Sequence, residues 1–122
     1  MEEINMATMQ DIVASVDEQG GVATLTMREL RHAYGAGRLG IYVVDAISRA
    51  LRNHGLGHFP RRLPRNQNEQ VRVFKLGSPV GEVIDAAIHV GKDHDQFLRE
   101  VGGAETAAVL QKVRELVSVD LE

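Results

Sequence analysis

Several residue types are missing or scarce in this chain of 122 residues, and each absence removes a class of function. Cysteine is absent, which excludes disulfides, thiol catalysis, zinc–thiolate sites and iron–sulfur clusters and is typical of a reducing compartment. Tryptophan is also absent and aromatic residues make up only 4%, which disfavours a base-stacking platform or a carbohydrate site.

Long apolar runs are missing as well. No run approaches the roughly 18 residues that a membrane-spanning helix needs. The first residues include acids where a secretory signal carries bases. We therefore expect a cytoplasmic protein with no membrane partner.

Positive charge is concentrated in the middle of the chain. Residues 28–75 contain ten of the 14 Lys and Arg residues and only three acids, Glu29, Asp45 and Glu69, which gives this block a net charge of +7. The formal charge of the whole chain is −3, so the two flanks together carry −10. A basic block attracts polyanions, and nucleic acid is the polyanion that small basic domains meet most often.

The first third of the sequence predicts two helices separated by a short strand. Apolar residues recur at helical spacing over residues 6–16, which predicts an amphipathic helix that stops at a glycine pair. Residues 22–26 are rich in β-branched side chains and bounded by glycine, which is typical of a brief strand. Thr26 and Glu29 have the spacing of a capping box, so a second helix should start there and end at Gly35, which can adopt a left-handed C-cap conformation.

A third helix is predicted over residues 41–54 and has two distinct faces. The apolar face consists of Val43, Val44, Ile47, Ala50 and Leu51. The polar face consists of Tyr42, Asp45, Ser48, Arg49 and Arg52. A face with two guanidinium groups is typical of a helix that enters a nucleic-acid groove, and an ordinary solvated face is the alternative.

Residues 56–59 and 70–76 predict two strands of a β-hairpin joined by a long polar loop. The loop contains three arginines and three side-chain amides: Arg61, Arg62, Arg65, Asn66, Gln67 and Asn68. Pro60 and Pro64 cannot sit in a central strand, so the loop should project from a sheet edge without packing inward. A flexible surface loop that binds nothing is the alternative.

The order helix, short strand, helix, glycine turn, helix and hairpin resembles the winged helix-turn-helix family over roughly residues 6–76. The resemblance implies a mainly α fold with a small β-hairpin in residues 1–77, followed by a C-terminal helical extension in residues 78–122. It also implies binding to double-stranded DNA, with the third helix in the major groove and the loop along the minor groove or phosphate backbone. The sequence departs from the family's tightest versions in its longer, glycine-rich turn, and Asp45 adds a negative charge to the reading face.

The expected DNA contacts come from the turn, the third helix and the loop. They are Arg38, Tyr42, Arg49, Arg52, Arg61, Arg62, Arg65, Asn66 and Gln67. Guanidinium groups form paired hydrogen bonds to guanine or phosphate, and side-chain amides suit backbone contacts. For Tyr42, packing against a neighbour is the alternative. The resemblance implies a transcriptional regulator or a nucleoid-associated protein.

The C-terminal extension is acidic and its pattern is helical. Ser78 and Pro79 predict the N-cap and first residue of one helix, and residues 104–119 predict a final helix with one apolar side. That side can pack within the chain or against a second copy in a homodimer that reads two half-sites. The extension also leaves open a winged-helix adaptor that docks on a protein partner, and an RNA-binding winged helix is the third reading.

Catalytic and metal-binding patterns are weak, so we expect neither an enzyme nor a bound cofactor or metal. His54 and His58 have metal-ligand spacing, but glycines interrupt the helix that would align them. Asp93, His94 and Asp95 are adjacent, which favours a capping or solvated turn before a helix over convergence on one metal. No pairing of a nucleophile with a base stands out.

Overall fold

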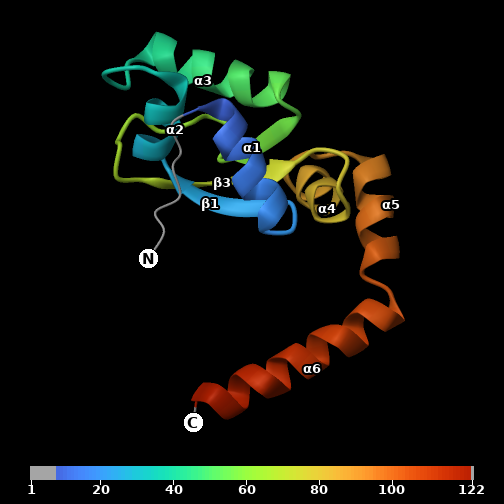
Figure 1. Cartoon of the computed structure of the whole chain (residues 1–122). Coiled ribbons are helices and arrows are strands. Elements are labelled where there is room, and N and C mark those ends of the chain that lie inside the picture. The colour runs from blue at the N-terminus through green and yellow to red at the C-terminus, as the bar shows by residue number, and fades with distance from the viewer. Residues whose placement is uncertain (1–7, 122) are drawn as a thin grey trace. The chain divides into compact units, whose positions relative to one another are not determined.

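The structure is a computed structural model that describes the backbone of residues 8–121 and the side chains of residues 8–103 and 107–115. The chain divides into two compact units after Asp85 (Figure 1). The first unit contains α1 (Met9–Glu18), β1 (Val22–Thr26), α2 (Met27–Tyr34), α3 (Ile41–Asn53), β2 (Leu56–Phe59) and β3 (Gln70–Lys75). The division falls within α4 (Pro79–Ile88), and the second unit contains α5 (Lys92–Val101) and α6 (Ala104–Leu121).

The three strands form one antiparallel sheet in the order β1-β3-β2, so β3 is its central strand. The predicted hairpin is present as β2 and β3, with Phe59 opposite Arg72. The predicted strand over residues 22–26 is present as β1, but its pairing was not predicted: β1 lies along the other edge of β3 and places Thr24 opposite Arg72. The described fold is therefore a mixed α/β structure with a small three-stranded sheet.

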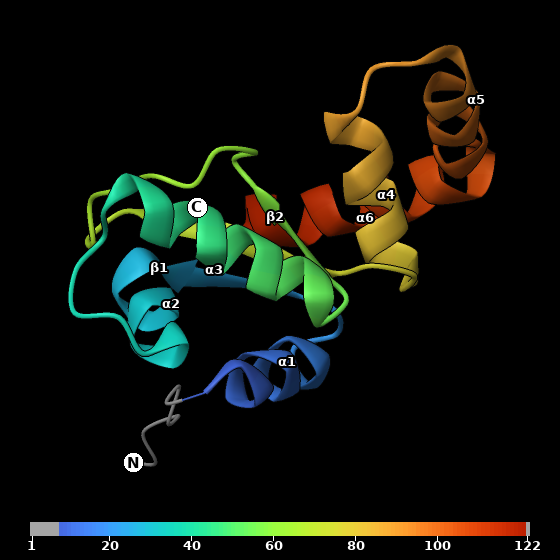
Figure 2. The ribbon, with the colours of Figure 1, turned by 90° about the horizontal axis from the view of Figure 1, so that it is seen from above.

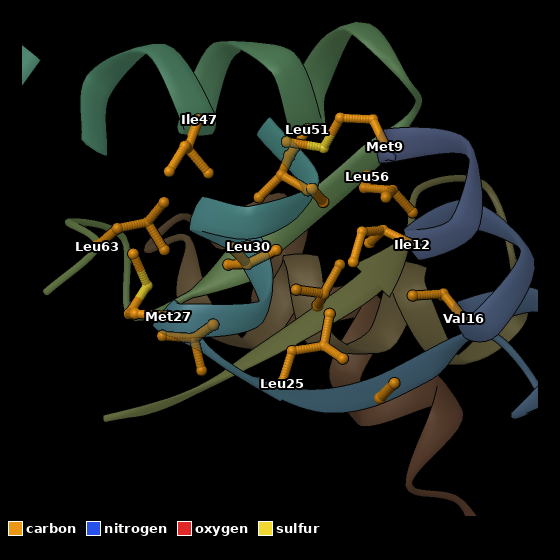
Figure 3. Packing of buried hydrophobic residues seen from close by; sticks show 14 of the residues in the cluster. Met9, Ile12, Val16, Leu25, Met27, Leu30, Ile47, Leu51, Leu56 and Leu63 are labelled. Carbon is orange, nitrogen blue, oxygen red and sulfur yellow. The ribbon is translucent and has the colours of Figure 1, made fainter. Parts of the chain in front are cut away.

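Three helices, α1, α2 and α3, cover one face of this sheet (Figure 1 and Figure 2). Val71 and Val73 alternate along β3 and point into the core beneath these helices. Figure 3 shows the core packing, which includes Met9, Ile12, Val16, Leu25, Met27, Leu30, Ile47, Leu51, Leu56 and Leu63. Each fully buried aliphatic side chain of this kind contributes about 1.5–3 kcal/mol, so the core fixes how α3 lies on the sheet.

Local capping signals set the helix boundaries. The predicted capping box is present, because the Thr26 hydroxyl accepts from the Glu29 amide (3.1 Å) and the Glu29 carboxylate accepts from the Thr26 amide (2.8 Å). α2 ends as predicted at Gly35, which has a left-handed φ of 89°. A second capping box at Thr8 precedes α1, and the predicted start of that helix at residue 6 lies outside the described residues.

The first turn of α4 lies directly on the end of β3. Ser78 caps this helix as predicted, since its hydroxyl accepts from the Gly81 amide (3.0 Å) and donates to the Lys75 carbonyl (2.7 Å). A Cβ atom at Gly81 would collide with the Lys75 carbonyl oxygen. Glycine at this position therefore permits the close approach of helix and strand.

In the second unit, the described side chains of α6, residues 107–115, are all exposed. They include three apolar residues, Val109, Leu110 and Val113. Across residues 8–121, none of the helices has the combination of length and apolar composition needed to cross a membrane.

Candidate nucleic-acid interface

The exposed face of α3 carries residues that were predicted to contact DNA. The predicted contacts are Tyr42, Arg49 and Arg52, and together with Asp45, which was not among them, they form one stripe at spacings of three and four residues. All four are exposed, and Tyr42 is 88% exposed, so its ring is not packed against a neighbour. The opposite face of α3 is buried through Val44, Ile47 and Leu51, so the stripe points away from the sheet.

The charges of this stripe are not neutralised by other side chains. Neither Arg49 nor Arg52 has an ion-pair partner in the described part of the chain, and the same holds for Asp45. The first turn of α3 contains no acid and its N-cap, Gly40, has no side chain to bond the free amides. Those amides add partial positive charge at the end of the helix nearest Tyr42.

Residues 60–69, here called the basic loop, join β2 to β3. Arg61, Arg62 and Arg65 are exposed and have no ion-pair partner within residues 8–121. The prediction that the loop projects without packing inward is wrong at Leu63, which is only 4% exposed and belongs to the core. Figure 3 shows Leu63 reaching this cluster beside Met27.

Backbone hydrogen bonds tie the returning half of the basic loop to the start of α2. The Met27 amide donates to the Glu69 carbonyl (2.9 Å), and the Arg28 amide donates to the Gln67 carbonyl (3.0 Å). These bonds use amides at the N-terminus of α2 that have no partner within the helix. The loop therefore has a defined path, with its arginines held on the surface of an anchored segment.

The remaining predicted contact residues occupy different environments. The Asn66 side-chain oxygen accepts from the Asn68 amide (2.9 Å), so Asn66 shapes the loop and keeps its NH₂ group for a ligand. Gln67 is half-buried. Arg38 is exposed in the turn before α3, where Arg31 donates to the Gly37 carbonyl (3.3 Å) and helps to hold that turn.

One histidine joins α3 to the basic loop, although its spacing in the sequence indicated only a weak metal ligand. His58 Nε2 lies 2.7 Å from the Ser48 hydroxyl on α3, and His58 Nδ1 lies 2.8 Å from the Pro60 carbonyl. A carbonyl oxygen can only accept, so Nδ1 donates to it and Nε2 of the neutral ring accepts from Ser48. Strand alternation could have revealed this role, because His58 and the buried Leu56 share the helix-covered face of β2.

The surroundings of His58 favour its neutral form. Burial lowers the pKa of His58 below its ordinary value, the bond to the Pro60 carbonyl raises it, and the nearby positive charge of Arg52 lowers it further. The net direction is downward. The neutral ring accepts from Ser48, so the lowered pKa supports the link between α3 and the loop.

The other candidate metal residues have separate roles. His54 Nδ1 donates to the Ala50 carbonyl (2.8 Å) at the end of α3. His54 and His58 therefore share no hydrogen-bond partner. Asp93, His94 and Asp95 lie in the first turn of α5, not in a turn before the helix as predicted, since α5 begins at Lys92.

The site thus presents arginines on a helix face and on an anchored loop, joined by a hydrogen-bonded histidine. No family model, curated protein sequence or solved structure shows a match to this chain. The arrangement of these side chains is therefore the basis for a function.

Proposed function

We propose that the first unit is a winged helix-turn-helix domain that binds double-stranded DNA, and that the chain acts as a transcriptional regulator or nucleoid-associated protein. The element order α1-β1-α2-α3-β2-β3 supports this proposal, since it follows the order of elements expected for that family. On this proposal α2 and α3 are the helix-turn-helix, and the basic loop is the wing.

The observation that carries the proposal is the set of unpaired arginines on two linked elements. Arg49 and Arg52 project from a helix whose exposed face is free to enter a major groove. The arginines of the basic loop project from an anchored segment that begins at Pro60, where His58 connects it to α3. A rigid link between two contact elements lowers the entropy lost when both engage the same duplex.

Asp45 fits this proposal as a base-reading residue. A carboxylate repels phosphate, but within the major groove it accepts a hydrogen bond from the amino group of cytosine. Its place on the stripe, between Tyr42 and Arg49, is in line with the arginines that would bond guanine. The stripe therefore favours G·C-containing sites.

Fluorescence anisotropy with a labelled random-sequence duplex across a salt series tests the proposal. Replacing Arg61, Arg62 and Arg65 together with Ala should weaken binding and reduce the slope of log K against log salt by roughly 3, one for each lost phosphate contact. A double Arg49→Gln and Arg52→Gln variant should also weaken binding through the helix.

A matched control removes the same charge from the second unit. The exposed residues Lys92, Lys112 and Arg114 are replaced with Ala, which should leave duplex affinity nearly unchanged. An equal loss in this control, or a lack of duplex binding by the unaltered protein at low salt, contradicts the proposal.

A second candidate function, association through α6, is favoured by the exposed apolar residues of that helix. Val113 lies four residues after Val109 and three after Leu110, so the three share one side of the helix, and all are exposed. We propose that this side pairs with a second copy of the chain, which would place two DNA-binding units in one particle. Docking on a different protein is the adaptor alternative for the same surface.

A further inference from the structure

The sheet has a second face, here called the outer face, which is turned away from α1, α2 and α3 (Figure 1). Because Val71 and Val73 point into the core, the alternate residues Gln70 and Arg72 point to the outer face. Strand register places Phe59 and Thr24 on either side of Arg72. One row of three side chains therefore crosses the sheet at right angles to the strands.

One end of the outer face is covered and the other is open. At the covered end, Phe74 is 1% exposed and lies against Gly57, where an added Cβ would approach its ring to 2.6 Å. Ser78 and Val80 approach Gly21 at the same end of the sheet. At the open end, Phe59 is 47% exposed although it is a large apolar side chain on a strand.

A hollow of about 280 Å³ lies at the open end of this face. It is lined by Thr24, Phe59, Pro60, Gln70, Val71 and Arg72. The lining combines an exposed aromatic ring with a guanidinium group, an amide and a hydroxyl, and it contains no acid. Arg72 is exposed and has no ion-pair partner among the described residues, so its charge is available to an anion.

The size and chemistry of the hollow favour one class of ligand. Sites that enclose small molecules have volumes of roughly 300–1,000 Å³ and surround most of the ligand, whereas this hollow lies on one face of a sheet. The scarcity of aromatic residues disfavours an extended stacking platform, but a single nucleobase needs only one flat partner to stack, and its neighbouring phosphate needs only a nearby cation. A strand of nucleic acid can therefore use a shallow site that a free small molecule would not fill.

We propose that the outer face binds single-stranded nucleic acid, with a base stacked on Phe59 and the adjoining phosphate held by Arg72. The Gln70 amide and the Thr24 hydroxyl lie beside that base and can bond its edge. This site goes beyond duplex binding. It borders the basic loop at Pro60, but the stripe on α3 points away from the sheet on its other side, so the helix contacts and the outer face are separate. A chain with both sites can hold a duplex and an adjoining single strand.

The test uses the full chain and fluorescein-labelled ten-nucleotide strands of deoxyuridine and of uridine, which differ only in the ribose hydroxyl. Phe59→Leu keeps an apolar side chain but removes the stacking surface, and it should lower the affinity roughly tenfold. Arg72→Gln should weaken binding and reduce the salt slope by about 0.7, the value for one phosphate on a single strand. Equal affinity for the two strands would indicate that binding uses stacking and phosphate contacts alone. Tighter binding of the uridine strand would indicate an additional contact to the ribose hydroxyl.

A tryptophan at position 59 supplies a direct signature of stacking. The chain contains no Trp, so Phe59→Trp introduces a single reporter whose emission a stacked base should quench. A fluorescence spectrum that does not change at saturating strand concentration, or full affinity in Phe59→Leu, would overturn the proposal. So would an absence of binding to both strands at low salt.

The Arg49→Gln and Arg52→Gln variant separates this site from the duplex site. It should lose duplex affinity and retain single-strand affinity, whereas Phe59→Leu should do the reverse. If only the duplex measurements fail, the proposed function fails and the outer-face site stands.

Discussion

At the scale of single residues, His58 has the most informative surroundings in the candidate interface. It connects Ser48 on α3 to the Pro60 carbonyl, and its pKa is lowered mainly by burial. A lowered pKa in the folded state means that the unfolded chain takes up the proton first as pH falls. The free energy of unfolding should therefore decrease as pH falls below about 6.5, and the decrease should stop once pH is below the lowered pKa of the folded state.

Chemical denaturation at a series of pH values between about 7.5 and 5 measures this effect. His58→Gln removes the titrating group and should flatten that part of the stability profile. His32 offers a matched control because it is exposed on α2, so His32→Gln should leave the profile unchanged. A profile that is the same for both variants would show that His58 does not couple pH to folding.

At the scale of elements, the basic loop is the segment whose structure differs most from a simple surface loop. Leu63 is buried in the core, whereas its neighbour Arg62 is exposed. Leu63→Ala should lower the free energy of unfolding by about 2 kcal/mol or more, because it leaves a cavity and releases the anchor. Arg62→Ala should change it by less than about 0.5 kcal/mol.

Urea denaturation of the two variants gives both values under the same conditions. Arg62→Ala should nevertheless weaken duplex binding, since it removes a proposed phosphate contact without disturbing the loop. Equal stability of Leu63→Ala and the unaltered chain would mean that the loop is not fastened to the core.

Elements defined by local signals were predicted well from the sequence. The capping box at Thr26 and the glycine at Gly35 fix α2 through contacts within a few residues, so the sequence pattern alone contains the information. The helical stripe of α3 was likewise visible, and Tyr42, Arg49 and Arg52 are exposed as expected. Ser48 was expected on the same polar face, but it is half-buried and bonds His58. β1 was predicted as a strand, but its pairing with β3 depends on residues about fifty positions away, which periodicity cannot reveal.

The parts of the candidate interface that were missed depend on contacts between elements. Leu63 is an isolated apolar residue in a polar loop, so no hydrophobic periodicity in the sequence predicts its burial. The bond between Ser48 and His58 joins a helix to a strand, and only their packing brings the two side chains together. The exposure of Phe59 could not be predicted either, because burial on the outer face depends on where α4 begins to cover the sheet.

At the scale of the whole molecule, the division into two units predicts that the first unit still folds when α5 and α6 are removed. The described core of the first unit draws on residues between Met9 and Val73, with none from α5 or α6. A chain that ends at Gly91 keeps α4 intact and should still unfold in one cooperative transition with a similar urea midpoint. If α6 pairs two copies, sedimentation should show a dimer for the full chain and a monomer for the truncated one.

Point variants in the full chain provide the control for this truncation. Leu110→Ser and Val113→Ser together should abolish association while leaving the thermal transition of the first unit in place, because both side chains are exposed. Loss of the cooperative transition on truncation would show that the first unit needs the second to fold.

The position of β3 has a consequence for synthesis on the ribosome. Among the strands of residues 8–121, β1 and β2 each pair only with β3, and β3 is the last of the three to be made. Until residue 75 has left the exit tunnel, both earlier strands lack their hydrogen-bonding partner, and the apolar face that the helices must cover is incomplete. The nascent chain therefore assembles this sheet in a single late step, after all three covering helices have already been translated.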